Sequence, residues 1–149
     1  MEACTKVGAI LGGGTESEID TLAFTGRRIG YLLGLRDDIV DSLNKEGHLQ
    51  NRLQFESVPL PILLAAESSE NINQKIAAIL KRKQISGSDA GELVEICFET
   101  GAFEKIGKIA KYHAKQTANK LCAIRSCYAK DVLGLIVQSF ADDIVKLYS

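Results

Sequence analysis

Apolar residues recur every three or four positions along most of this chain, which is the spacing of one face of an α-helix. No segment alternates apolar and polar residues with β-branched side chains in the way that a β-strand does. The clearest apolar stripe lies within 102–125, opposite a row of lysines, and comprises Phe103, Ile106, Ile109, Ala110, Ala114, Ala118 and Leu121. The pattern predicts one all-α domain over 1–149, an antiparallel bundle of about six or seven helices.

Glycines and a capping pair mark the boundary between the first two helices. Residues 2–12 are expected to be the end of a helix, closed by Gly12-Gly13-Gly14. Thr15 is placed to cap the next helix, and Glu18 completes a capping box with it. We expect this second helix to be unusually long and to extend over 16–44.

A polar connection and two prolines organise the rest of the chain. The connection is expected over 47–56, and Pro59 and Pro61 suit the first turn of a short buried helix. Glycine-containing breaks then separate the remaining helices, which are expected over 70–83, 89–99, 102–125 and 127–147.

The long second helix carries an acidic trio near its C-terminal end, formed by Asp37, Asp38 and Asp41. On an ideal helix these residues lie within an arc of about 100°. Asp37 and Asp41 are one turn apart, and like charges at that spacing destabilise a helix. The helix dipole also disfavours carboxylates in the C-terminal half. A placement that violates these local rules indicates a functional site.

Magnesium is the cation that this spacing suits, because Mg²⁺ prefers one or two carboxylates together with water and phosphate oxygens. Carboxylates bridged by metal ions can hold a diphosphate and stabilise the charge that builds on it as a leaving group. The alternative is a solvated acidic patch at a helix end, and the short motif alone does not decide between the two interpretations.

Three glycines, Gly26, Gly30 and Gly34, form a stripe on the same helix that continues onto Asp38. Each costs roughly 1 kcal/mol relative to alanine in a helix. One explanation is close contact with a neighbouring helix. The other is a cleft wall left bare below the acids, with room for an apolar chain, and both can hold along one helix.

Composition narrows the classes of partner. The net charge of −1 gives no reason to expect nucleic acid or an anionic membrane, and the longest apolar run, PLPILLAA, is too short for a transmembrane segment. The cysteines lack paired C-x-x-C spacing and are expected to be reduced, semi-buried thiols of a cytoplasmic protein; they are Cys4, Cys97, Cys122 and Cys127.

Several segments together resemble the trans-isoprenyl diphosphate synthases, or polyprenyl synthetases. KVGAILGGGTESEIDTLAFTGRRIGYLLGLRDDIVD is similar to that family's small-residue turn, G-x-x-x-G helix and second aspartate-rich motif. SVPLPILLA resembles its T-L-P-L helix, and ETGAFEKIGKIAKYHAKQTANKL resembles its S-G-A helix. The resemblance implies an isoprenoid-synthase-like fold, of which this chain is the incomplete C-terminal half.

In that family an allylic diphosphate is ionised and joined to isopentenyl diphosphate, with Mg²⁺ held by two aspartate-rich motifs. The resemblance therefore implies that the acidic trio binds Mg²⁺ and that the partners are allylic and isopentenyl diphosphates. Gly30, Gly34 and Lys45 are the expected substrate-binding positions. Lys45 and Arg52 are the candidates for a positive charge here, although neither matches a motif position.

The departures from the family pattern are substantial. The first aspartate-rich motif is missing, so we expect this chain to be inactive alone and to act with a missing N-terminal half, or as a homodimer, in a larger or split enzyme. Leu33-Gly34 replaces the usual Phe-Gln, which favours an alternative: a non-catalytic or regulatory helical subunit that keeps the fold. The retained acids count against that alternative. Arg27 and Arg28 are expected to make surface or subunit contacts.

Overall fold

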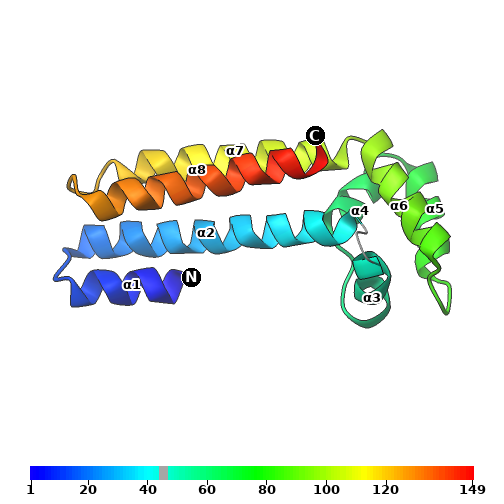
Figure 1. Ribbon diagram of the computed structural model, residues 1–149, viewed down its shortest axis with the longest axis horizontal. Helices are drawn as coiled ribbons and strands as arrows, with labels where there is room; N and C mark the ends of the chain where they lie inside the picture. The colour runs from blue at the N-terminus through cyan, green and yellow to red at the C-terminus, as the bar shows by residue number, and fades with distance from the viewer. Residues whose placement is uncertain (44–46) are drawn as a thin grey trace. The chain divides into compact units, whose positions relative to one another are not determined.

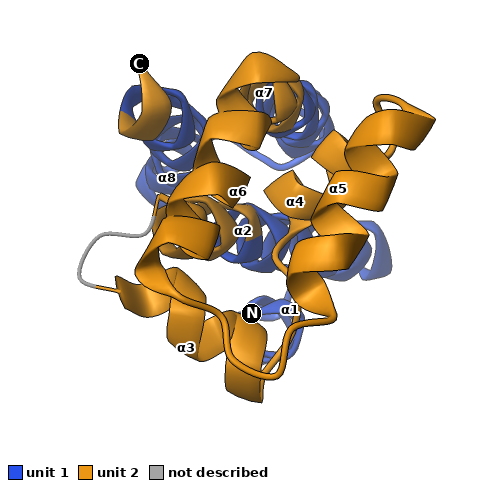
Figure 2. Ribbon diagram, turned by 90° about the vertical axis from the view of Figure 1, so that its right-hand side faces the viewer, with its two compact units in different colours: residues 1–34, 108–146 blue, residues 35–107, 147–149 orange. Residues whose placement is uncertain are grey.

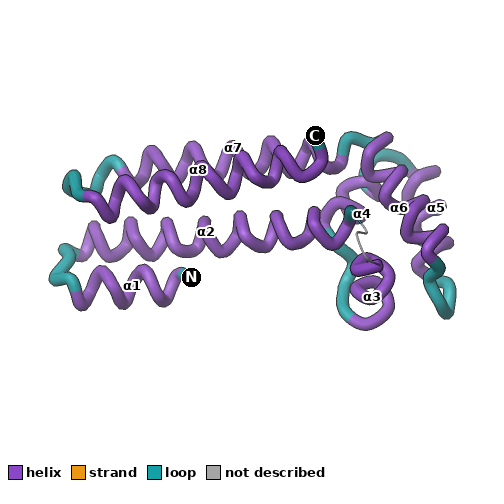
Figure 3. The backbone as a smooth tube through the Cα atoms, in the orientation of Figure 1, coloured by secondary structure: helices purple, strands orange, loops and turns teal. Residues whose placement is uncertain are grey.

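The computed structural model describes residues 1–43 and 47–149. Across these two ranges the chain forms eight helices and no strand (Figures 1 and 3). They are α1 Glu2–Leu11, α2 Glu16–Ser42, α3 His48–Phe55, α4 Leu60–Ala66, α5 Glu70–Leu80, α6 Gly87–Glu99, α7 Ala102–Leu121 and α8 Tyr128–Tyr148. The all-α prediction is confirmed, but the expected number of six or seven helices is wrong.

The extra helix is α3, which lies inside the segment expected to be a polar connection. It begins after Gly47, whose φ of 77° is in the left-handed region that glycine adopts without strain. Leu49 is fully buried, so a single apolar side chain anchors most of this short helix. The following turn behaves as expected, because Pro59 is extended at the N-cap of α4 and Pro61 is buried within its first turn.

The boundary between α1 and α2 confirms the predicted capping chemistry. The Thr15 backbone N–H donates to Glu18 Oε2 at 2.9 Å, and the Glu18 N–H donates back to Thr15 Oγ1 at 3.3 Å. Gly13 takes a φ of 68° just after α1 ends. Because the orphan donors of the first turn of α2 are satisfied by this box, the helix starts where the sequence predicts.

The described residues divide into two compact units (Figure 2). Unit 1 comprises 1–34 and 108–146, and unit 2 comprises 35–107 and 147–149. The division falls within α2, within α7 and near the end of α8, so each of these helices contributes residues to both units. The prediction of a single domain over 1–149 stays a prediction.

Unit 1 packs α1 back along the first part of α2 (Figure 1). Gly26 lies at a close approach of the two helices, because an added Cβ would lie 2.8 Å from the Met1 carbonyl oxygen and 3.0 Å from Glu2 Cα. Arg27 fixes the same contact from its exposed side with an ion pair to Glu2 at 2.5 Å. One glycine of the stripe is therefore explained by helix packing, and the surface contact expected of Arg27 is confirmed.

Unit 2 is built around the buried ring of Phe103, which contacts the rings of Phe98 and Tyr148 at centroid distances of 4.8 and 6.0 Å. A capping box of Ser86 and Asp89 starts α6: the Asp89 N–H donates to Ser86 Oγ at 3.2 Å, and the Ser86 N–H donates to Asp89 Oδ2 at 2.8 Å. These contacts hold the pKa of Asp89 below its usual value.

The cysteines correct a prediction. All four thiols are free, as expected, but only Cys97 is buried, whereas Cys4, Cys122 and Cys127 are exposed. Burial raises the pKa of the Cys97 thiol to about 12. The three exposed thiols lie on α1 and in the connection between α7 and α8.

His113 should make unit 1 less stable as the pH falls. Its ring contacts the rings of Tyr31 and Tyr112 at 4.8 and 5.3 Å. Burial lowers the pKa of His113 below its usual value of 6.5, and the positive charge of Arg28 adds to this. The unfolded chain therefore binds the proton more readily, so stability should decrease as the pH drops through 6.5 towards the lowered pKa.

Denaturant titrations at several pH values between about 7.5 and 5 would measure this dependence. The variant His113→Gln should show a flatter profile over that range, because it removes the titrating ring. Equal slopes for the wild type and His113→Gln would contradict the assignment.

Candidate functional site

The acidic end of α2 meets a cation supplied by the chain itself. Arg52 Nη2 lies 2.5 Å from Asp38 Oδ1, and Arg52 Nη1 lies 2.5 Å from Asp41 Oδ2. The three side chains are only 17%, 21% and 28% exposed for Arg52, Asp38 and Asp41, respectively. We call this group the Arg52 clamp. Because one guanidinium bridges both carboxylates away from bulk water, it is a stronger contact than an exposed surface pair.

Asp38 also serves the following helix. Its second oxygen, Oδ2, accepts the backbone N–H of Leu60 at 3.2 Å. Leu60 is the first residue of α4, and the N-cap residue Pro59 has no side-chain hydrogen bond to offer. Asp38 thus satisfies a donor that would otherwise be orphaned at the start of α4. A single carboxylate thereby joins α2 to both α3 and α4.

Electrostatics in the clamp favour the charged guanidinium. Burial acts against the charge of Arg52, but the hydrogen bonds to Asp41 and Asp38, together with their negative charges, outweigh burial and raise the pKa of Arg52. Its Nε is buried and has no hydrogen-bond partner among the described residues. A polar pocket of about 180 Å³ opens beside the clamp and is lined by Asp41, His48, Asn51, Arg52 and Glu56.

Asp37 does not join the clamp. Its side chain is 68% exposed, and its charged neighbour is Arg36 at 3.9 Å. Among the residues that the structure describes, no three acidic, histidine or cysteine side chains are grouped so that they could hold a metal ion. As arranged here, the trio does not fit Mg²⁺, since Arg52 holds two of its three carboxylates and the third lies apart.

Of the three expected substrate-binding positions, the structure describes Gly30 and Gly34. A Cβ at Gly34 would meet nothing within 4 Å among the described atoms, and one at Gly30 would lie 3.5 Å from the flexible Met1 side chain. Gly34 therefore has no packing partner among the described atoms, whereas Gly26 is a packing glycine, and the cleft-wall interpretation of Gly34 stays a prediction. Lys45 lies outside the described residues. Arg28 stacks on the Phe24 ring at 4.9 Å, and the expectation that it makes a surface or subunit contact stays a prediction.

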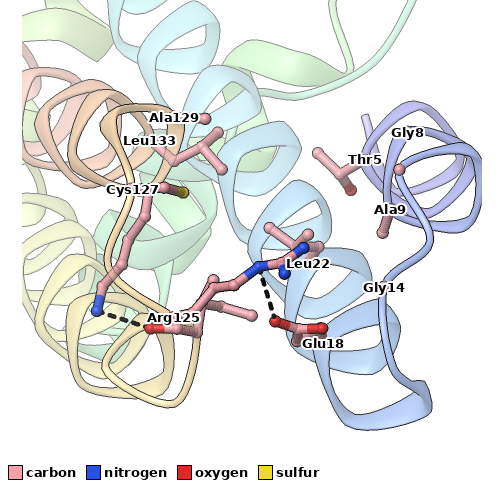
Figure 4. Close-up of a pocket in the computed structure, with 13 residues that line it drawn as sticks. Thr5, Gly8, Ala9, Gly14, Glu18, Leu22, Arg125, Cys127, Ala129 and Leu133 are labelled. Carbon is pink, nitrogen blue, oxygen red and sulfur yellow. Dashed lines mark hydrogen bonds and ion pairs between the residues drawn. The ribbon is translucent and has the colours of Figure 1, made fainter.

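A separate apolar pocket of about 300 Å³ lies within unit 1 (Figure 4). Its walls come from α1, the turn after it, the first turns of α2, the segment that joins α7 to α8 and the start of α8. Arg125 Nε lies 3.6 Å from Glu18 Oε1 across it, and Lys130 donates to the Ile124 carbonyl at 2.9 Å. None of the predicted site residues that the structure describes lines this pocket.

Arg52 is the residue that sequence reasoning undervalued. Its role depends on contacts across 11 and 14 residues of chain, which no local motif reveals. The available signal was the pair Leu49 and Leu53, which are spaced one helical turn apart in HLQNRLQF and indicate a short helix that brings Arg52 back towards the acids.

Comparison with known proteins gives a consistent result. Over 143 residues, 91% of this chain, it is 30% identical to a short chain isoprenyl diphosphate synthase of Methanothermobacter thermautotrophicus, covering 43% of that protein. It is 32% identical over 100 residues to geranylgeranyl pyrophosphate synthase 12, chloroplastic, of Arabidopsis thaliana, and 35% identical over 81 residues to the putative synthase 8 of the same plant. These matches cover 28% and 22% of the plant proteins.

The chain thus spans less than half the length of the curated relatives that it matches. No family profile and no solved structure match it. None of the described helices is both long enough and apolar enough to cross a membrane.

Proposed function

We propose that this chain, a member of the trans-isoprenyl diphosphate synthase family, takes part in isoprenoid biosynthesis as one portion of a larger or split enzyme. The reaction is transfer of a prenyl group from an allylic diphosphate to isopentenyl diphosphate. The observation that carries this proposal is the similarity to curated synthases along 91% of the chain. The acidic trio at the end of α2 lies within the segment that resembles the family's second aspartate-rich motif.

The proposed contribution of this chain is one acidic wall for a diphosphate. A diphosphate leaving group needs positive charge around it, because negative charge builds on it as the bond between its oxygen and the allylic carbon breaks. In the complete enzyme Asp37, Asp38 and Asp41 would hold Mg²⁺, which would supply that charge. The described arrangement does not fit this ion, so the proposal requires Arg52 to release Asp38 and Asp41. Gly30, Gly34 and Lys45 remain the proposed substrate-binding positions.

A partner that completes the fold is part of the same proposal. The apolar side chains of Val7, Ile10 and Leu11 on α1 are 53%, 53% and 82% exposed. Exposed apolar side chains on one short helix favour burial against another chain. The partner is either the missing half of the synthase or a second copy of this chain.

One observation favours the second candidate function, a non-catalytic or regulatory subunit. Arg52 and the Leu60 N–H give Asp38 and Asp41 a structural role that needs no metal. The acids can therefore be retained in a chain that binds no substrate. Asp37 accepts no hydrogen bond from Arg52 or the Leu60 N–H. A substitution of Asp37 therefore distinguishes the two functions.

The isolated chain should form little or no product from isopentenyl diphosphate, geranyl diphosphate and Mg²⁺. Radiolabel transfer from isopentenyl diphosphate into an extractable prenyl product measures this directly. Addition of a synthase fragment that carries a first aspartate-rich motif should restore product, because the diphosphate is then held from both sides. In the restored assay Asp37→Asn should lower the rate by about 100-fold, a loss within the range seen when charge stabilisation is removed from an active site.

Asp20→Asn is the matched control, since it makes the same change at an exposed position of the same helix. It should leave the restored rate unchanged. Synthesis at a normal rate by the isolated chain would refute its dependence on a partner. Equal restored rates for the wild type and Asp37→Asn would favour the non-catalytic subunit.

A further inference from the structure

The Arg52 clamp uses the same carboxylate oxygens that a divalent cation needs. Asp38 Oδ1 and Asp41 Oδ2 accept from the guanidinium at 2.5 Å, and Asp38 Oδ2 accepts the Leu60 N–H at 3.2 Å. Both oxygens of Asp38 are therefore occupied. A cation that approached these acids would also meet a positive charge already in place and only partly screened by solvent.

The clamp also has a route by which it can open. Arg52 lies in the last turn of α3, and its side chain lines the polar pocket of about 180 Å³ together with Asn51 and Glu56. Glu56 is exposed and carries a carboxylate, so it offers an alternative partner for a guanidinium that leaves Asp38 and Asp41. The buried Nε of Arg52 has no partner within the clamp, so part of the hydrogen-bonding capacity of this side chain is unused there.

We propose that Arg52 is an internal counter-ion that keeps the acidic trio closed to divalent cations, so that the trio binds a cation only when Arg52 leaves Asp38 and Asp41. Arg52 pairing and cation binding are then mutually exclusive states of one site. This inference deepens the proposed function, because it rests on the same acids, and it identifies a residue that controls when they are available.

Direct cation binding tests the exclusion. Mn²⁺, used in place of Mg²⁺, can be titrated into the whole chain while free Mn²⁺ is followed by electron paramagnetic resonance. Arg52→Gln should bind Mn²⁺ at least about tenfold more tightly than the wild type, because it removes a positive charge that lies in contact with two ligand groups. Arg52→Lys, which keeps the charge but cannot bridge both carboxylates, should fall between them.

Arg27→Gln is the matched control, because it removes an arginine from an ion pair of the same length at Glu2, away from the trio. Its affinity for Mn²⁺ should equal that of the wild type. Folded Arg52→Gln protein, verified by circular dichroism, that binds Mn²⁺ no better than Arg27→Gln would overturn the proposal.

If neither Arg52 variant folds, the wild-type chain itself can test whether Arg52 pairing and cation binding exclude each other. Nuclear magnetic resonance of the Arg52 guanidinium protons should show slow exchange without metal, since both Nη groups donate to carboxylates. Added Mg²⁺ should either leave these signals and the aspartate carboxyl signals unchanged or change both together. Absent guanidinium signals, or aspartate signals that shift while the guanidinium signals persist, would overturn the exclusion.

The Mn²⁺ titration is independent of prenyl transfer. Arg52→Gln can gain affinity in a chain whose assay with the complementing fragment fails, and that result would support the counter-ion while rejecting the enzymatic proposal. Restored synthesis that depends on Asp37, together with unchanged Mn²⁺ affinity in Arg52→Gln, would support the enzyme and reject the counter-ion.

Discussion

Asp38→Ala should lower the free energy of unfolding by about 3 kcal/mol, the cost expected when one partner of a largely buried ion pair is removed. The substitution leaves Arg52 with only Asp41 and leaves the Leu60 N–H without its acceptor. Both groups are part-buried, so water only partly replaces the lost carboxylate. Chemical denaturation monitored by circular dichroism measures the change.

Asp37→Ala is the control for the effect of Asp38→Ala on stability. Asp37 carries the same charge one residue earlier, but its side chain is 68% exposed. We expect its effect on stability to stay within about 0.5 kcal/mol, as for most surface positions. Equal losses for Asp37→Ala and Asp38→Ala would show that the Arg52 clamp does not stabilise the fold.

Gly26→Ala should destabilise unit 1 by about 2 kcal/mol, a typical cost of overpacking. The new methyl group would collide with Thr5 Oγ1 and would also press on the backbone of Met1 and Glu2. Backbone atoms cannot turn aside as a side chain can, so α1 must move away from α2. Thermal unfolding, with a fluorescent probe attached to the exposed Cys4 on α1 after Cys122 and Cys127 are replaced by serine, would report that separation.

Gly34→Ala provides the opposite expectation on the same helix. No described atom within 4 Å obstructs a Cβ at Gly34, so alanine should raise stability by up to about 1 kcal/mol through its better helix propensity. The double variant Thr5→Ala with Gly26→Ala should recover only part of the loss, because the backbone contacts remain. Full recovery would assign the close approach to the Thr5 side chain alone.

The long helix and its capping were predictable because they depend on neighbouring residues. Thr15 and Glu18 are three residues apart, and their reciprocal hydrogen bonds follow from local chain geometry. The end of α2 at Ser42 lies within two residues of the expected end. Local signals of this kind carry enough information to locate a helix without any knowledge of its neighbours in the fold.

The partners of the acids were not predictable in the same way. The sequence places Asp37, Asp38 and Asp41 on one helix, but it does not reveal that Arg52 and Leu60 meet Asp38 from 14 and 22 residues away. The polar character of 47–56 predicts a connection, whereas the structure forms α3 there and buries Leu49 fully. Tertiary contacts therefore decided the environment of the acids, whereas local rules showed only that their placement was costly.

The distribution of thiols offers a built-in probe of how the molecule opens. Cys97, with its pKa of about 12, is the buried thiol and belongs to unit 2, which also holds the Arg52 clamp. The three exposed thiols all belong to unit 1. A mild alkylating reagent should therefore modify these three cysteines rapidly and Cys97 only when unit 2 unfolds. The slow phase of the reaction then measures the rate at which unit 2 opens, without any substitution in the chain.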